Sequence, residues 1–179
     1  MELFPFALQD NSLSAGPTST LTAGLTVDAT TAFSVTRPAS AGNSWDFRAI
    51  TNYNNVYSIR GIPSTTAFTG FMGLTDSSIS SETDFSSGTT SKRTGIYFDA
   101  GGVMKAQCNG VLGSTLGISF TTSGNVKVKY VQSTNSVEMT YGTTPLSTCA
   151  LSWTPSGLEA SVWINVPSTA FKDLLMGVL

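Results

Sequence analysis

The sequence predicts an all-β fold, built as a two-sheet antiparallel sandwich with a short C-terminal helix. Three observations lead to this prediction. Short runs rich in Val, Ile, Thr, Phe and Tyr alternate along the chain with clusters of Gly, Asn, Ser and Pro, which is typical of strands and turns. Several runs alternate apolar with polar residues, as half-buried strands do. The clearest helical pattern is confined to the last residues of the chain.

The domain organisation follows from the length of 179 residues, which favours a single domain with one core. Residues 1–16 are interpreted as the first strand or as an arm that docks on a neighbouring subunit. Residues 17–167 are predicted to form the sandwich, and residues 168–179 the helix. The predicted strands lie at about 24–29, 32–36, 44–50, 56–62, 68–74, 95–100, 103–108, 116–122, 125–131, 136–142, 149–153 and 160–166.

The stretch "GIYFDAGGVMKAQCNG", residues 95–110, could be a ligand-cradling loop or a set of hairpin turns. A phosphate loop needs a glycine-rich turn that leads into a helix N-terminus. The residues after Gly102 show no helical stripe and lead directly into Asn109-Gly110, a strong hairpin signal because both turn positions need a positive φ. We therefore predict a three-strand meander here.

The stretch "NVKVKYVQSTNSVEMTYG" is the clearest hairpin of the sequence. Val126, Val128 and Tyr130 alternate with Lys127 and Lys129. After the turn the apolar residues again alternate with polar ones, including a glutamate. One face is therefore expected to be buried and the other solvated, with Lys and Glu opposite each other across the strands.

The segment "STAFKDLLMGVL" places Phe171, Leu174, Leu175 and Val178 at helical spacing, with Ser168 as a suitable N-cap. We predict a short C-terminal helix whose apolar stripe serves packing. The apolar ends of the chain, at Leu3 to Leu8 and at residues 171–179, together with the weak surface charge, predict a homo-oligomer.

The composition excludes several classes of function. Only 11% of residues are charged, whereas 51 are Ser or Thr, so the solvated faces must be rich in hydroxyl groups. Nine Lys and Arg against eleven Asp and Glu leave no surplus for phosphates, and we predict no nucleic-acid partner. Histidine is absent, which removes the commonest general base and metal ligand. No apolar run is long enough for a membrane span.

Cys108 and Cys149 are the only cysteines. A disulfide between them would close a loop and stabilise the folded state by about 4 kcal/mol in chain-entropy estimates. The N-terminus lacks the charged start and apolar run of a signal peptide, so synthesis in a reducing cytosol favours free, buried thiols.

Two features are candidates for ligand binding. Tyr53 lies among Asn52, Asn54 and Asn55 in a predicted loop, where amides and an aromatic ring suit a sugar or a peptide, although Asn-rich turns are also simply turns. Trp163 is predicted to point away from the face that buries Val162, so that it covers a second layer, a neighbouring subunit or a ligand.

The acidic residues show neither the spacing of a metal-binding loop nor a catalytic pair that can be recognised from the sequence. Asp76, Glu82 and Asp84 lack the spacing of a calcium-binding loop, so we expect a solvated loop there. Glycoside hydrolysis needs two carboxylates that converge from separate strands, for which Asp46, Asp99 and Glu159 are the candidates. We predict no catalytic residues, no metal and no cofactor.

The order of features over residues 45–166 resembles the concanavalin-like β-sandwich family that includes SPRY domains and viral lectin-like modules. The stretch "FTGFMGLTD" looks like its glycine-flanked strand, and the two hairpin stretches above are similar to its glycine-turn and solvent-faced hairpins. The resemblance implies a binding or scaffold module, of the jelly-roll or concanavalin-like kind, without catalytic residues. The metal ligands of legume lectins have no counterpart here.

The hydroxyl-rich, charge-poor composition is similar to that of virion surface proteins such as phage fibre heads and spikes. We therefore expect a non-enzymatic attachment protein at the virion surface, made in the host cytoplasm without a signal peptide. Its expected partners are other virion subunits and a carbohydrate or protein of the host surface. The alternatives are a purely structural capsid or decoration protein and a carboxylate-based glycan hydrolase.

Overall fold

The computed structural model describes residues 20–21, 26–28, 34–36, 47–49, 56–76, 78, 92–164 and 169–178 of the chain. These residues form fourteen strands and one short 3-10 helix, η3 (Gln132–Thr134). The strands are β1 (Thr20–Leu21), β2 (Thr26–Asp28), β3 (Ser34–Thr36), β4 (Phe47–Ala49), β5 (Val56–Pro63), β6 (Gly70–Asp76), β7 (Arg93–Asp99), β8 (Val103–Cys108), β9 (Val111–Ser119), β10 (Val126–Val131), β11 (Ser136–Tyr141), β12 (Thr144–Ala150), β13 (Leu158–Ile164) and β14 (Thr169–Val178).

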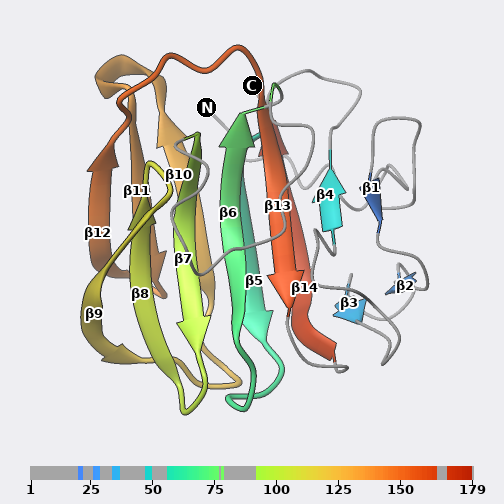
Figure 1. Ribbon diagram of the computed structural model, residues 1–179. Helices are drawn as coiled ribbons and strands as arrows, with labels where there is room; N and C mark the ends of the chain where they lie inside the picture. The colour runs from blue at the N-terminus through green and yellow to red at the C-terminus, as the bar shows by residue number, and fades with distance from the viewer. Residues whose placement is uncertain are drawn as a thin grey trace.

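The strands form two antiparallel sheets that pack face to face, which confirms the predicted all-β sandwich (Figure 1). Sheet A has the order β1-β4-β13-β6-β7-β8-β9, and sheet B has the order β12-β11-β10-β5-β14-β3-β2. Sheet A faces the viewer in Figure 1, with β10, β11 and β5 of sheet B behind it.

The main core lies between the sheets and is built by the apolar residues that alternate along each strand. Phe68 and Phe98 are fully buried, and their ring centroids lie 5.5 Å apart. Phe171 packs edge-on against both rings, at 5.3 Å and 5.2 Å. Other members of this core are Ile59, Met72, Leu74, Ile96, Met104, Phe120, Val126, Val128, Val137, Met139, Leu158, Ala160 and Val162.

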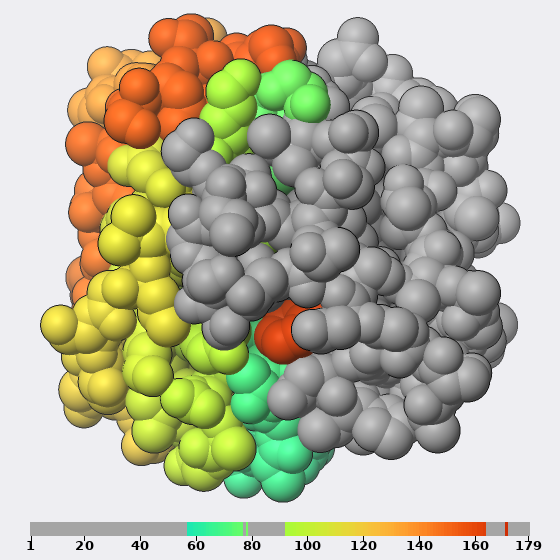
Figure 2. Space-filling model, viewed as in Figure 1, coloured from blue at the N-terminus to red at the C-terminus, as the bar shows by residue number. Residues whose placement is uncertain are grey.

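The predicted three-strand meander is confirmed as β7, β8 and β9. Asn109 and Gly110 both have positive φ, 50° and 79°, as a tight hairpin turn requires. The side chain of Asn109 also ties this turn to sheet B, because its amide nitrogen donates to the carbonyl oxygen of Ala150 at 2.9 Å. Its oxygen accepts from the backbone N–H of Ser152 at 3.0 Å. The glycine-rich stretch is therefore a set of turns that fastens the two sheets together. β9 reaches the surface at one side of the molecule (Figure 2).

The predicted solvent-faced hairpin is confirmed as β10 and β11. Val128 lies opposite Met139, and both are fully buried. Lys129 lies opposite Glu138 on the other face, as predicted. The strand predicted at 149–153 is displaced, since β12 covers Thr144–Ala150 and pairs with β11 across a turn at Gly142.

The predicted C-terminal helix is wrong, because residues 169–178 form strand β14. This strand lies between β5 and β3 in sheet B and pairs with both. Its pairing with β5 shifts register between Lys172 and Leu175 and again at Gly177. A bulge adds a residue to the two-residue period of a strand, so apolar residues fall three or four apart and imitate a helix.

The interpretation of free thiols is also wrong. Cys108 at the end of β8 and Cys149 in β12 form a disulfide, with their Cα atoms 5.6 Å apart. The bond joins sheet A to sheet B beside the Asn109 turn. The N-terminal residues on which the thiol interpretation depended say nothing about this local geometry.

Residues 1–16, predicted as an arm or first strand, lie outside the described residues, as do Asp46, Glu82 and Asp84. Among the described residues there is no helix with the length and apolar character needed to cross a membrane.

Candidate functional site

Trp163 lies on the face of β13 that points away from the main core, as predicted. Its neighbours Ala160 and Val162 belong to the main core, whereas Trp163 forms a second cluster with Phe71 and Tyr97. The indole ring stacks on Tyr97 with a centroid distance of 6.5 Å and is 5% exposed. Trp163 therefore contributes to a second buried layer on the outer face of sheet A, and its contact with a ligand stays a prediction.

Buried polar side chains continue this outer face across β13, β6, β7 and β8. The Nε atom of Arg93 donates to the side-chain oxygen of Gln107 at 2.9 Å, and its guanidinium lies 5.3 Å from the ring centroid of Phe71. The hydroxyl of Ser161 donates to that of Thr75 at 3.0 Å. All five side chains are buried. The bonds among these side chains show that they hold strands together, and we assign them no ligand.

Asp99 and Glu159, two of the three carboxylates proposed for glycan hydrolysis, do not converge. Glu159 lies opposite Thr75, which lies opposite Arg93 at the start of β7. Asp99 is the last residue of the same strand, so the two carboxylates are separated by about 20 Å along the sheet. Hydrolases hold their pair within about 10 Å. Asp99 instead pairs with Lys105 at 2.9 Å, and Asp46 lies outside the described residues.

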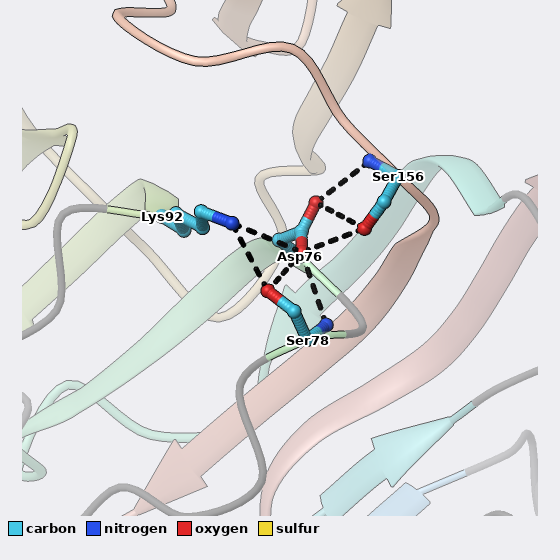
Figure 3. A network of polar contacts seen from close by, with 4 residues as sticks. All are labelled: Asp76, Ser78, Lys92 and Ser156. Carbon is cyan, nitrogen blue, oxygen red and sulfur yellow. Dashed lines mark hydrogen bonds and ion pairs between the residues drawn. The ribbon is translucent and has the colours of Figure 1, made fainter.

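Asp76 was expected in a solvated loop, but it is fully buried at the end of β6. Its carboxylate accepts hydrogen bonds from the backbone N–H groups of Ser78 and Ser156, at 3.0 Å and 2.9 Å (Figure 3). Both serine hydroxyls also donate to it, and the Nζ atom of Lys92 lies 3.7 Å away. The expectation failed because Ser156, which is 80 residues away in the chain, joins Ser78 in donating to Asp76, and the sequence does not show this contact.

The electrostatics of Asp76 follow from these bonds. Burial alone would raise the pKa of the carboxyl group, but the hydrogen bonds from Ser78 and Ser156 outweigh it and lower the pKa to about 2. The network joins the end of β6, the residue before β7 and the loop before β13. It is a structural clasp, and no group of three or more potential metal ligands occurs in the part of the chain that the structure describes.

Three cations lie on the outer face of sheet B, where Arg60 is exposed and Lys127 and Lys129 are half-buried. Arg60 on β5 lies opposite Lys127 on β10, and Lys129 follows two residues later on the same face. The flanking residues Ile59, Val126 and Val128 are buried in the core, so the three cations point outward. We call Arg60, Lys127 and Lys129 the cationic patch.

The predicted loop Asn52–Asn55, with Tyr53, lies outside the described residues, so its ligand-binding role stays a prediction. The two lysines of the cationic patch are visible in the sequence as an alternation, but Arg60 is not associated with them there. Only the pairing of β5 with β10 brings Arg60 beside Lys127, from 67 residues away in the chain. A strand register of that kind leaves no local signal.

Comparisons with known proteins identify the fold. A scan against models of protein families gave no match, and a search of curated protein sequences gave no significant match. Among solved structures, the sandwich is similar to the PSpry domain of TRIM65, with a TM-score of 0.63 and 12% identity over 100% of this chain and 99% of that one.

A second similar structure is the SPRY domain of human HERC1, with a TM-score of 0.54 and 12% identity. The match covers 92% of this chain and 97% of that domain. These similarities show that the chain has the concanavalin-like β-sandwich fold of SPRY domains, as the sequence resemblance implied.

Proposed function

We propose that this protein is a non-enzymatic surface protein of a virion, such as a fibre head, a spike or a minor capsid protein. In this proposal it attaches the particle to a carbohydrate or a protein on the host surface. The observation that carries the proposal is the cationic patch, an open sheet face where cations remain available to a partner. The polar side chains of Thr75, Arg93, Gln107 and Ser161 on the outer face of sheet A are by contrast buried in the fold.

Three further observations support the proposal. The SPRY-type sandwich resembles a family of binding modules, and the candidate carboxylates Asp99 and Glu159 do not form a hydrolytic pair. A surface rich in hydroxyl groups is similar to that of virion proteins. A disulfide is typical of secreted, cell-surface and virion-surface proteins. With synthesis in the host cytoplasm, the disulfide would form after the particle leaves the cell.

The alternative is a purely structural capsid or decoration protein whose partners are other virion subunits, including copies of itself. A carboxylate-based glycan hydrolase ranks third. Glu159 lies level with the first residue of β7, whereas Asp99 is the last residue of β7, so the two carboxylates are far apart. The hydrolase would become a candidate again only if the protein turned over a glycan and the single alanine variants of Asp46, Asp99 and Glu159 each abolished that turnover.

The test is a glycan array together with an assay of binding to host cells, both with the purified full chain. Reproducible binding to one sugar class, or saturable binding to protease-sensitive sites on the cells, is the expected result. If the array and the cells both stay silent while the protein incorporates into particles, the structural alternative replaces the attachment function.

A further inference from the structure

The cations whose side chains the structure describes fall into two groups. Lys92 and Lys105 lie within 3.7 Å and 2.9 Å of Asp76 and Asp99, and Arg93 is buried against Gln107 and Phe71. The cationic patch is different, because no ion pair joins Arg60, Lys127 or Lys129 to a carboxylate among the described residues. Among the cations whose side chains the structure describes, the unpaired ones therefore lie on one face, in a chain whose net charge is -2.

The register of sheet B fixes the spacing of the cationic patch. Arg60 and Lys127 are direct cross-strand neighbours, so their Cβ atoms are about 5 Å apart. Lys127 and Lys129 are separated by two residues on one strand, which spaces them by about 7 Å. Glu138 lies opposite Lys129 and is the nearby acid on this face. The patch thus presents three positive groups along a strand and across to its neighbour.

Such an arrangement costs free energy in the isolated protein, because like charges on neighbouring strands repel. The effect is visible at Lys127, whose pKa is lowered by partial burial and then by the charges of Lys129 and Arg60. An anionic partner would relieve this repulsion and form charge-assisted hydrogen bonds with all three cations. The geometry therefore favours a partner with several negative charges along its length.

The surroundings of the cationic patch favour a carbohydrate over a peptide. Thr140 lies opposite Lys127, and the exposed Thr148 lies opposite Glu138, so hydroxyl groups flank the cations on the next two strands. Hydroxyl groups both donate and accept, which suits the hydroxyl groups of a sugar. The site is an open sheet face that spans β5, β10 and β11, which suits an extended chain.

We propose that the cationic patch binds a sulfated polysaccharide, with Arg60, Lys127 and Lys129 each pairing with a sulfate or carboxylate group and Thr140 contacting the sugar. This inference rests on the proposed attachment function and names its ligand class. It assigns the binding to sheet B, whereas the loop at Asn52–Asn55 and Trp163 stay separate candidates.

The test measures the affinity of the full chain for heparin, with the single variants Lys127→Gln, Lys129→Gln and Arg60→Gln. Each should weaken binding about tenfold, the value of one lost charged contact. Lys105→Gln removes the same charge from sheet A and should leave the affinity unchanged. Glu138→Gln should strengthen binding. Thermal unfolding of every variant confirms that the fold is retained.

The control ligands separate sulfated carbohydrate from charge in general. Hyaluronan, which carries carboxylates but no sulfate, poly-glutamate and single-stranded DNA should all bind more weakly than heparin at equal charge. The inference would be overturned if any of these ligands bound as tightly as heparin. It would also be overturned if Lys105→Gln and Lys127→Gln lowered the affinity for heparin equally. If heparin does not bind but another glycan or host protein does, the ligand class is wrong and the attachment function stands. If nothing binds, both fail.

Discussion

At the scale of single residues, Asp76 shows how a buried charge can stabilise this fold. Its ordinary pKa of 3.8 is lowered to about 2 in the folded chain, so its contribution is complete above about pH 4. That contribution is lost as the pH falls from about 4 to 2, and it amounts to about 2 kcal/mol. We expect Asp76→Asn to lower the free energy of unfolding by about 1–3 kcal/mol at neutral pH.

The measurement is urea unfolding at several pH values between 2 and 6. The difference between wild type and Asp76→Asn should shrink as the pH falls through this range. Asp99→Asn is the matched control, because it removes a carboxylate that is 41% exposed. A difference that stays constant with pH would show that the clasp depends on shape and not on charge.

Lys127 gives a second prediction at this scale. Its pKa is lowered first by partial burial and second by Lys129. Lys129→Gln should therefore raise the pKa of Lys127 part of the way to its ordinary value of 10.5. Glu138→Gln should lower it further, because Glu138 is the group that raises it. Carbon chemical shifts of the lysine side chain, followed by NMR from pH 8 to 12, report both changes. An unchanged pKa of Lys127 in both variants would show that the charges of Lys129 and Glu138 do not affect it.

At the scale of elements, the disulfide between β8 and β12 is the covalent link between the two sheets. The cysteines are 41 residues apart, and closing such a loop is worth about 4 kcal/mol in the chain-entropy estimate. We expect the Cys108→Ser/Cys149→Ser variant to unfold at a lower temperature than the oxidised protein. Reduction of the wild type should give a similar shift in calorimetry, and no shift in either would show that the cross-link is absent in solution.

The elements also show which patterns the sequence can reveal. The β10–β11 hairpin and the β7–β8–β9 meander were predicted correctly, because alternation and turn residues are local signals. β14 was missed because its register irregularities disguise the two-residue period. The buried state of Asp76 and the proximity of Arg60 to Lys127 depend on contacts between distant segments. No single stretch of the sequence carries a signal for those contacts.

At the scale of the whole molecule, the structure removes one of the two apolar ends on which the prediction of a homo-oligomer was based. Phe171 is fully buried in the chain's own core, and β14 pairs on both sides within the chain's own sheet B, so this strand is not a free end awaiting a partner. The N-terminal residues Leu3 to Leu8 remain as the proposed contact between subunits. We expect light scattering to give a multiple of 18.7 kDa for the full chain and a lower mass after deletion of residues 1–10.

The control for that deletion is removal of residues 169–179, which should unfold the domain because β5 and β3 would lose the strand between them. A monomer mass for both the full chain and the shortened chain would exclude the oligomer.

The position of β14 also determines the order in which the molecule can be made. Sheet B contains strands from both halves of the chain, and its neighbours β5 and β3 are joined only through residues 169–178. Residues 169–178 follow every other described strand of sheet B along the chain, so the sheet keeps a gap between β5 and β3 until this segment is in place. Since such non-local pairing is slow and leaves strand edges exposed, the edges of β5 and β3 should be the sites where an incompletely folded chain aggregates.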